Sequence, residues 1–214
     1  KMYDFKSLNV SKLKKIRKNE LPNFCKSFRE ELIKITSNTG GHVGPNLGVI
    51  ELTVALYYVF DFPEDTLIWD IGHQTYVQQI ITNRYKKLST IRKDGMAPGY
   101  SNANESKYDA VTSSHAGSSL SLAIGVNHAN FLNKNKKFSI AVCGDASFVE
   151  GPIQEALNHM SKAHDRLIFI INDNETAIDN NWGGYHDYFK KNKPNKIKKS
   201  KFQYLDIDYY STID

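Results

Sequence analysis

The sequence has little cysteine and no long hydrophobic run. Its 214 residues include only Cys25 and Cys143, which lack the paired spacing of zinc sites. We expect two free thiols in a reducing compartment. No apolar stretch approaches the roughly 20 residues of a membrane span, which excludes a membrane-integral protein. The first residues do not form a secretory signal, so we expect that any targeting segment has been removed or was never present.

The charge balance shows a modest basic excess. The chain has 28 Lys and Arg against 23 Asp and Glu, a formal net charge of +5. Much of the excess lies in residues 12–18 and 190–201. Neither run is interleaved with aromatic residues, so a solvated surface is favoured over an anionic partner, and no nucleic acid is expected. The Lys/Asn-rich run 190–201 is predicted to be locally disordered.

Hydrophobic periodicity predicts helices that alternate with short apolar strands. Two stretches are expected to be loops, the turn-rich residues 37–48 and the polar residues 86–114. Because each strand is almost continuously apolar, we expect both faces of a parallel sheet to be covered. The predicted fold class is therefore α/β, a doubly wound parallel sheet flanked by helices. The helices are expected at 20–36, 49–60, 116–133 and 152–163, and the strands at 66–70, 138–143 and 167–171.

Polar residues follow each predicted strand, at the edge of the sheet where α/β proteins bind ligands. Asp145 and Asn174 follow two strands that a single helix connects, so we expect them to lie close together. Their oxygens suit Mg²⁺, which often shares its ligand shell with phosphates. The backbone N–H groups of Ala146 and Ser147 could receive a diphosphate. The alternative is a helix cap at Asp145 and a turn at 172–174, and the spacing does not separate the two interpretations.

Three histidines lie in loops rich in small residues, where a ring can reach a ligand. They are His42, His73 and His115, and His73 directly follows a predicted strand. A structural hydrogen-bonding role is the alternative for each. No Gly-x-Ser-x-Gly elbow and no phosphate-binding Lys loop of the Walker type is present.

Residues 41–56 and 69–76 closely resemble the amino-terminal domain of 1-deoxy-D-xylulose-5-phosphate synthases. Residues 155–159 and 171–175 continue the likeness, which extends from about residue 8 to 176. The segment from Gly144-Asp145 to Asn174 is similar to the thiamine-diphosphate motif that transketolase-like enzymes share. The fold implied is that of the transketolase-like thiamine-diphosphate-binding domain.

The resemblance assigns roles to individual residues. It implies that Asp145, Asn174 and the Thr176 carbonyl hold Mg²⁺, and that His42 faces the reacting carbon of the cofactor. We expect His42 and His73 to be the catalytic residues for proton transfer, because the ordinary histidine pKa is about 6.5. It also implies contacts with thiamine diphosphate from a larger set of residues, namely His73, His115, Ala116, Gly117, Ala146, Ser147, Asn174 and, as a further candidate, Tyr209.

The activity implied is the condensation of pyruvate with D-glyceraldehyde 3-phosphate to 1-deoxy-D-xylulose 5-phosphate and CO₂, by a complete enzyme that is a homodimer. The resemblance implies that this product leads to isoprenoid precursors, thiamine and pyridoxal. Two alternatives stay open: the amino-terminal subunit of a two-chain transketolase, and a non-catalytic diphosphate-binding module. Bacterial cytoplasm and a plastid are both open as the compartment.

The sequence departs from the family pattern in places. Ala146 stands where the motif has Gly, and Ser114 replaces the Gly that usually precedes the His115 equivalent. We expect a diphosphate-binding domain over 1–176, a shortened lid or linker over 177–201 and the start of the following segment over 202–214. The pyrimidine-binding and carboxyl-terminal domains of the family have no counterpart in these residues, so the isolated chain is predicted to be inactive.

Overall fold

The computed structural model describes residues 3–91, 99–112, 115–173, 182–191, 198–202 and 207–211. The contacts divide the chain into two compact units, residues 1–115 and residues 116–214. We call them the first and the second unit and describe each by itself.

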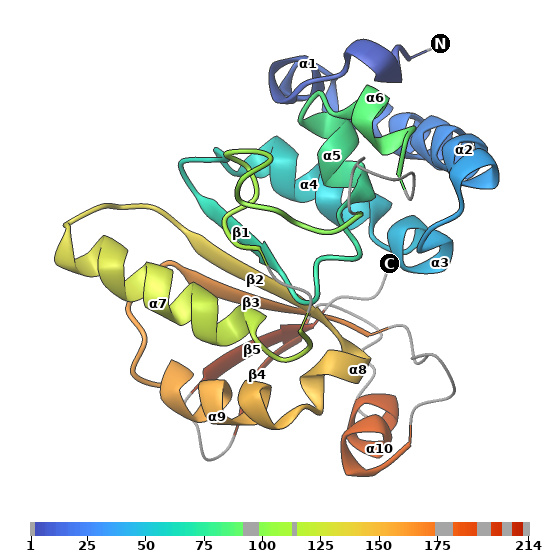
Figure 1. Ribbon diagram of the computed structural model, residues 1–214. Helices are drawn as coiled ribbons and strands as arrows, with labels where there is room; N and C mark the ends of the chain where they lie inside the picture. Colours follow the sequence, from blue (N-terminus) through green and yellow to red (C-terminus); the bar gives the residue numbers. More distant parts are fainter. Residues whose placement is uncertain are drawn as a thin grey trace. The chain divides into compact units, whose positions relative to one another are not determined.

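In its described residues, the first unit is mainly helical and contains the single strand β1, Thr66–Trp69 (Figure 1). Its longest helix, α2, spans Leu21–Thr39 and confirms the predicted helix at 20–36. Pro22 stands in the first turn of α2, and Phe24, Phe28 and Leu32 form its buried face. Two short 3₁₀ helices cover Phe5–Ser7 and Lys18–Glu20. The other described elements are α1 Val10–Lys14, α3 Val43–Leu47, α4 Ile50–Val59, α5 Tyr76–Ile81 and α6 Tyr85–Leu88.

The second unit is built on a pair of parallel strands. Strands β2, Ser139–Gly144, and β3, Leu167–Asn172, pair in register from Ser139 opposite Leu167 to Gly144 opposite Asn172. Helix α9, Gly151–Met160, connects them and packs with α7, Ser119–Leu132 (Figure 1). This strand–helix–strand connection confirms the α/β class. The core of the unit consists of Leu120, Ile124, Cys143, Phe148, Ile153, Ala156 and Leu157.

The remaining elements of the second unit are short. Helix α8 spans Asp145–Phe148, α10 spans Gly184–Lys191, and β4, Lys198–Phe202, pairs antiparallel with β5, Ile207–Ser211. Cys25 and Cys143 are buried thiols, and burial raises the pKa of Cys25 to about 11. Within the described ranges, no helix is both long and apolar enough to cross a membrane.

Four expectations from the sequence are wrong in detail. The expected loop at 37–48 contains α3, whose turn is closed by the Gly48 N–H donating to the Gly44 carbonyl. Helix α6 replaces the beginning of the expected loop at 86–114. The run 190–201 includes the end of α10 and strand β4, because pairing with β5 satisfies the backbone despite the lysines. Strand β3 is half-buried rather than buried.

Candidate functional site

The turn after β1, which leads into His73, contains a residue with a strained backbone conformation. Ile71 has a φ of 63° and Gly72 a φ of 86°, and the Gly72 N–H donates to the Asp70 carbonyl over 2.7 Å. A β-branched residue rarely adopts a left-handed conformation, and strain of this kind concentrates at functional sites. The turn therefore marks the end of β1 as a candidate site.

The first unit brings His42 and His73 together. Their ring centroids lie 5.4 Å apart with the planes at 70°, and the ring of Tyr100 lies 5.5 Å from that of His42. His42 and Tyr100 are half-buried. Two of the three loop histidines predicted from the sequence thus lie in one cluster of rings with Tyr100, an aromatic residue that sequence reasoning did not identify.

The ring of His73 has a buried nitrogen with no partner in the described part of the chain. Its Nδ1 atom is inaccessible to solvent and makes no hydrogen bond there. Burial, reinforced by the neighbouring His42, lowers the pKa of His73, while Asp70 opposes the shift. His73 is therefore neutral near pH 7, and its ring can form a hydrogen bond with a bound ligand.

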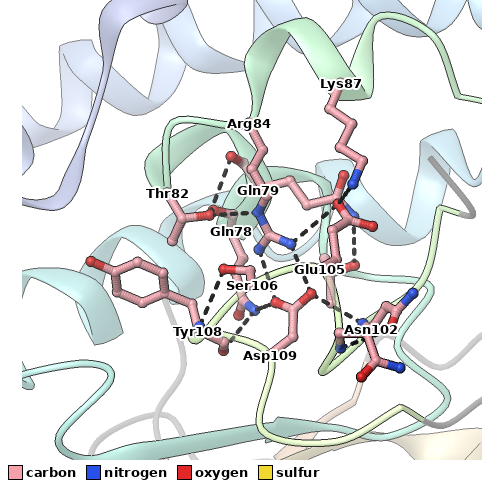
Figure 2. A network of polar contacts seen from close by, with 12 residues as sticks. Gln78, Gln79, Thr82, Arg84, Lys87, Asn102, Glu105, Ser106, Tyr108 and Asp109 are labelled. Atoms are coloured by element: carbon pink, nitrogen blue, oxygen red, sulfur yellow. Dashed lines mark hydrogen bonds and ion pairs between the residues drawn. The ribbon is translucent and has the colours of Figure 1, made fainter. Parts of the chain in front are cut away.

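A buried ion-pair network fixes the loop that carries Tyr100 (Figure 2). Arg84 donates to both carboxylate oxygens of Asp109, over 2.7 and 2.8 Å. The same carboxylate accepts from the Gln78 side chain over 2.8 Å and from the Asn102 N–H over 3.1 Å. Glu105, itself 3% exposed, lies 3.5 Å from Arg84. These contacts hold residues 102–109 against α5 and the start of α6.

The second unit places two carboxylates at the ends of its parallel strands. Because Gly144 pairs with Asn172, the next residues, Asp145 and Asp173, are neighbours. Asp145 is 8% exposed and Asp173 is exposed. Burial, and then the proximity of Asp173, raises the pKa of Asp145 to about 6. A divalent cation would stabilise the buried Asp145 carboxylate and offset its repulsion with Asp173, so the donor chemistry fits Mg²⁺.

The backbone beside these carboxylates is accessible. A Cβ atom added to Gly144 would meet no atom within 4 Å, Ala146 is exposed, and Ser147 is buried. Gly117, with a φ of 86°, packs so that an added Cβ would lie 3.1 Å from Cβ of Glu150. The predicted turn at Gly117 therefore lies against the residues that join α8 to α9.

The structure leaves other predicted site residues untested or describes them one at a time. Asn174 and Thr176 lie outside the described residues. Tyr209 belongs to β5. His115 is exposed at the end of the first unit, and Ala116 is half-buried at the beginning of the second. In the portion that the structure describes, no group of three or more His, Cys, Asp or Glu side chains could hold a metal ion.

Sequence reasoning missed Asp173 as a site residue. The expected turn at 172–174 included it, but the metal-ligand argument selected Asn174. The signal that could have found it is the parallel register, in which residues at equal distances from two strand ends lie side by side.

Comparison with known proteins agrees with the resemblance seen in the motifs. A family model described as 1-deoxy-D-xylulose-5-phosphate synthase matches residues 6–208. The synthase of Methylacidiphilum infernorum is 46% identical over 179 residues, which cover 84% of this chain and 28% of that protein. The synthase of Alkaliphilus oremlandii is 42% identical over 183 residues, which cover 86% of this chain and 29% of that protein.

Solved structures show the same fold at lower identity. Transketolase from Leishmania mexicana superposes with a TM-score of 0.65 at 19% identity, over 89% of this chain and 31% of that one. Transketolase from Campylobacter jejuni gives a TM-score of 0.58 at 17% identity, over 85% of this chain and 30% of that one. The doubly wound, transketolase-like fold is thus confirmed.

The sequence likeness is more specific than the likeness of fold. The chain spans 28% to 29% of the length of these curated relatives, both of which are synthases. The family model covers most of the chain, including both candidate sites. The chain therefore belongs to the 1-deoxy-D-xylulose-5-phosphate synthase family.

Proposed function

We propose that this chain is the diphosphate-binding part of an enzyme that condenses pyruvate with D-glyceraldehyde 3-phosphate, giving 1-deoxy-D-xylulose 5-phosphate and CO₂. Membership of the family supports the reaction. The observation that carries the binding role is the pair of carboxylates, Asp145 and Asp173, at the ends of two neighbouring parallel strands. The homodimer and the compartment stay predictions.

Mg²⁺ would be held at the end of β2 by the buried carboxylate of Asp145. Asn174 and the carbonyl of Thr176, assigned by the resemblance, would complete the protein ligands. Asp173 would add negative charge beside the ion. Mg²⁺ prefers carboxylate, amide and phosphate oxygens, so this donor set favours a metal-bridged diphosphate. The accessible backbone at Gly144 and Ala146 leaves room for such a ligand.

Thiamine diphosphate, when bound, would supply the nucleophilic carbon for the decarboxylation of a 2-oxo acid. The chain's own residues would hold protons and orient the substrate. Burial lowers the pKa of His73 and favours its neutral form, in which one ring nitrogen can donate a hydrogen bond and the other can accept one. His42 lies beside it, and we propose that the pair moves or holds protons on the reacting oxygens.

Calorimetric titration of the chain with inorganic diphosphate and with thiamine diphosphate tests this proposal. We expect binding of both that requires Mg²⁺. Asp145→Asn should weaken binding by at least roughly tenfold, because it removes the buried anionic ligand of the ion. The matched control is Asp165→Asn. Asp165 is exposed and precedes the first residue of β3, whereas Asp173 follows the last. Equal binding by the wild type and Asp145→Asn, or binding without Mg²⁺, would contradict the proposal.

A further inference from the structure

A single buried amide ties together the backbone around both candidate catalytic histidines. The side chain of Asn46 is fully buried. Its Nδ2 atom donates to the carbonyl of His42 and to the carbonyl of His73, each over 2.8 Å. Its Oδ1 atom accepts from the N–H of Tyr76 over 2.9 Å. Asn46 therefore fixes the backbone of His42, His73 and Tyr76 relative to one another.

The hydroxyl group of Tyr76 extends this frame to the ring of His42. Tyr76 is 1% exposed. Its hydroxyl oxygen accepts from the backbone N–H of His42 over 3.1 Å and lies 3.5 Å from Nδ1 of the same residue. A hydroxyl group that accepts one hydrogen bond still has its own proton to donate, and Nδ1 of a neutral imidazole can accept it.

The backbone makes room for this hydroxyl group at a specific position. Gly41 has a φ of 124°, and a Cβ atom added there would lie 2.6 Å from the Tyr76 hydroxyl oxygen. A side chain at position 41 would therefore both strain the backbone and displace the hydroxyl group. The glycine beside His42 is thus required by the approach of Tyr76.

We propose that Tyr76 is a positioning residue that donates its hydroxyl proton to Nδ1 of His42 and so holds the neutral imidazole in its Nε2–H form. Asn46 holds the two residues in position through its hydrogen bonds to the His42 carbonyl and the Tyr76 N–H. In this form, His42 presents a proton on Nε2, on the side of the ring away from Tyr76. Its significance for catalysis rests on the proposed function: His42 would donate a hydrogen bond to an oxygen that gains negative charge, rather than remove a proton.

Nuclear magnetic resonance of the chain labelled with ¹⁵N-histidine tests the proposal. Spectra that correlate ring nitrogens with ring protons are recorded at about pH 8, above the ordinary histidine pKa of about 6.5. The chain has seven histidines, and His42→Gln identifies the signals of His42. We expect the wild type to show a protonated Nε2 and a hydrogen-bonded, unprotonated Nδ1. A wild-type His42 that carries its proton on Nδ1 overturns the proposal without any further variant.

Two variants then remove the hydroxyl contact in different ways. Tyr76→Phe deletes only the oxygen, and Gly41→Ala places a methyl group where the oxygen lies. In either variant that keeps the amide spectrum of the folded chain, we expect the Nδ1 signal to move and an Nδ1–H form to appear. An unchanged Nδ1 signal in a folded Tyr76→Phe or Gly41→Ala variant overturns the proposal.

The matched control is Tyr58→Phe. The Tyr58 hydroxyl donates to the carbonyl of Ile16 over 3.1 Å, so this variant loses one tyrosine hydrogen bond elsewhere in the first unit. We expect the His42 signals to stay in place, and the same shift in Tyr58→Phe would overturn the proposal by making the effect non-specific. The spectra require no turnover and no diphosphate. A failure of the calorimetric test would therefore refute the proposed function and leave this result intact.

Discussion

At the scale of single residues, Asn46 shows how much one buried side chain can determine. It satisfies two carbonyl groups and one N–H group that belong to three residues of the candidate site. Water cannot replace these partners easily, since Asn46 and Tyr76 are almost completely buried. Its contribution therefore concerns both the stability of the first unit and the geometry of the histidines.

We predict that Asn46→Ala lowers the free energy of unfolding by about 3 kcal/mol, because it leaves buried polar groups without partners. Denaturant unfolding followed by circular dichroism measures the change. The control is Asn38→Ala, since Asn38 donates a single bond to the Lys34 carbonyl from an exposed position on α2. That variant should differ from the wild type by less than about 0.5 kcal/mol. Similar losses in the two variants would contradict the central role of Asn46.

The lowered pKa of His73 predicts a pH dependence of stability. A histidine whose pKa is lower in the folded state binds more protons when the chain unfolds, so stability increases with pH. The contribution is present above the ordinary pKa of about 6.5 and is lost as the pH falls below it. We expect the wild type to lose stability relative to His73→Asn between about pH 7.5 and pH 5.5.

Thermal melts at several pH values compare these two proteins. His159→Asn serves as the control, because His159 is exposed on α9. A difference between the wild type and His73→Asn that does not change with pH would show that His73 is not held neutral by burial.

At the scale of elements, residues 99–112 form a loop without helix or strand, and the Arg84–Asp109 ion pair holds it in place (Figure 2). The side chains of Arg84 and Asp109 are 9% and 1% exposed. Removal of one partner from such a pair leaves a buried charge without compensation. The segment that carries Tyr100 therefore depends on electrostatic contacts rather than on a hydrophobic face.

We predict that Asp109→Asn destabilises the chain by about 3 kcal/mol, because the buried Arg84 guanidinium loses the negative charge that compensates it. Denaturant unfolding again gives the measurement. Glu51→Gln breaks the exposed Arg29–Glu51 pair and should cost less than about 1 kcal/mol. If Asp109→Asn costs no more than Glu51→Gln, the network does not anchor the loop.

Local pattern predicted some elements correctly and others not. Helix α2 has apolar residues at helical spacing, α4 is a longer apolar stretch, and β2 and β3 are short apolar runs bounded by polar residues; all four elements were expected. Helix α3 contains two turn-forming residues, Gly44 and Pro45, so composition indicated a loop. Its turn is stabilised by the Asn46 side chain bonding the His42 carbonyl, and the same amide reaches His73, 27 residues away. Composition could not reveal that contact.

At the scale of the whole molecule, the chain corresponds to less than a third of each relative. We predict that the 214 residues alone bind Mg²⁺ and diphosphate but form no product from pyruvate and glyceraldehyde 3-phosphate. The resemblance assigns the glutamate that activates the cofactor to a pyrimidine-binding domain outside these residues. A coupled assay for CO₂ release measures turnover, and sustained product formation by the pure chain would contradict the prediction. A longer protein that carries this segment and the pyrimidine-binding domain is the positive control.

The sequence by itself determined the α/β class, the family and the position of Asp145 at the end of a strand, because apolar periodicity and motif spacing are local properties of the chain. Tertiary structure decided which side chains meet. Asp173 faces Asp145 through strand register, Tyr76 reaches His42 across 34 residues, and Arg84 reaches Asp109 across 25. Such contacts depend on how helices and loops pack, and packing is a property of the folded chain rather than of any local pattern.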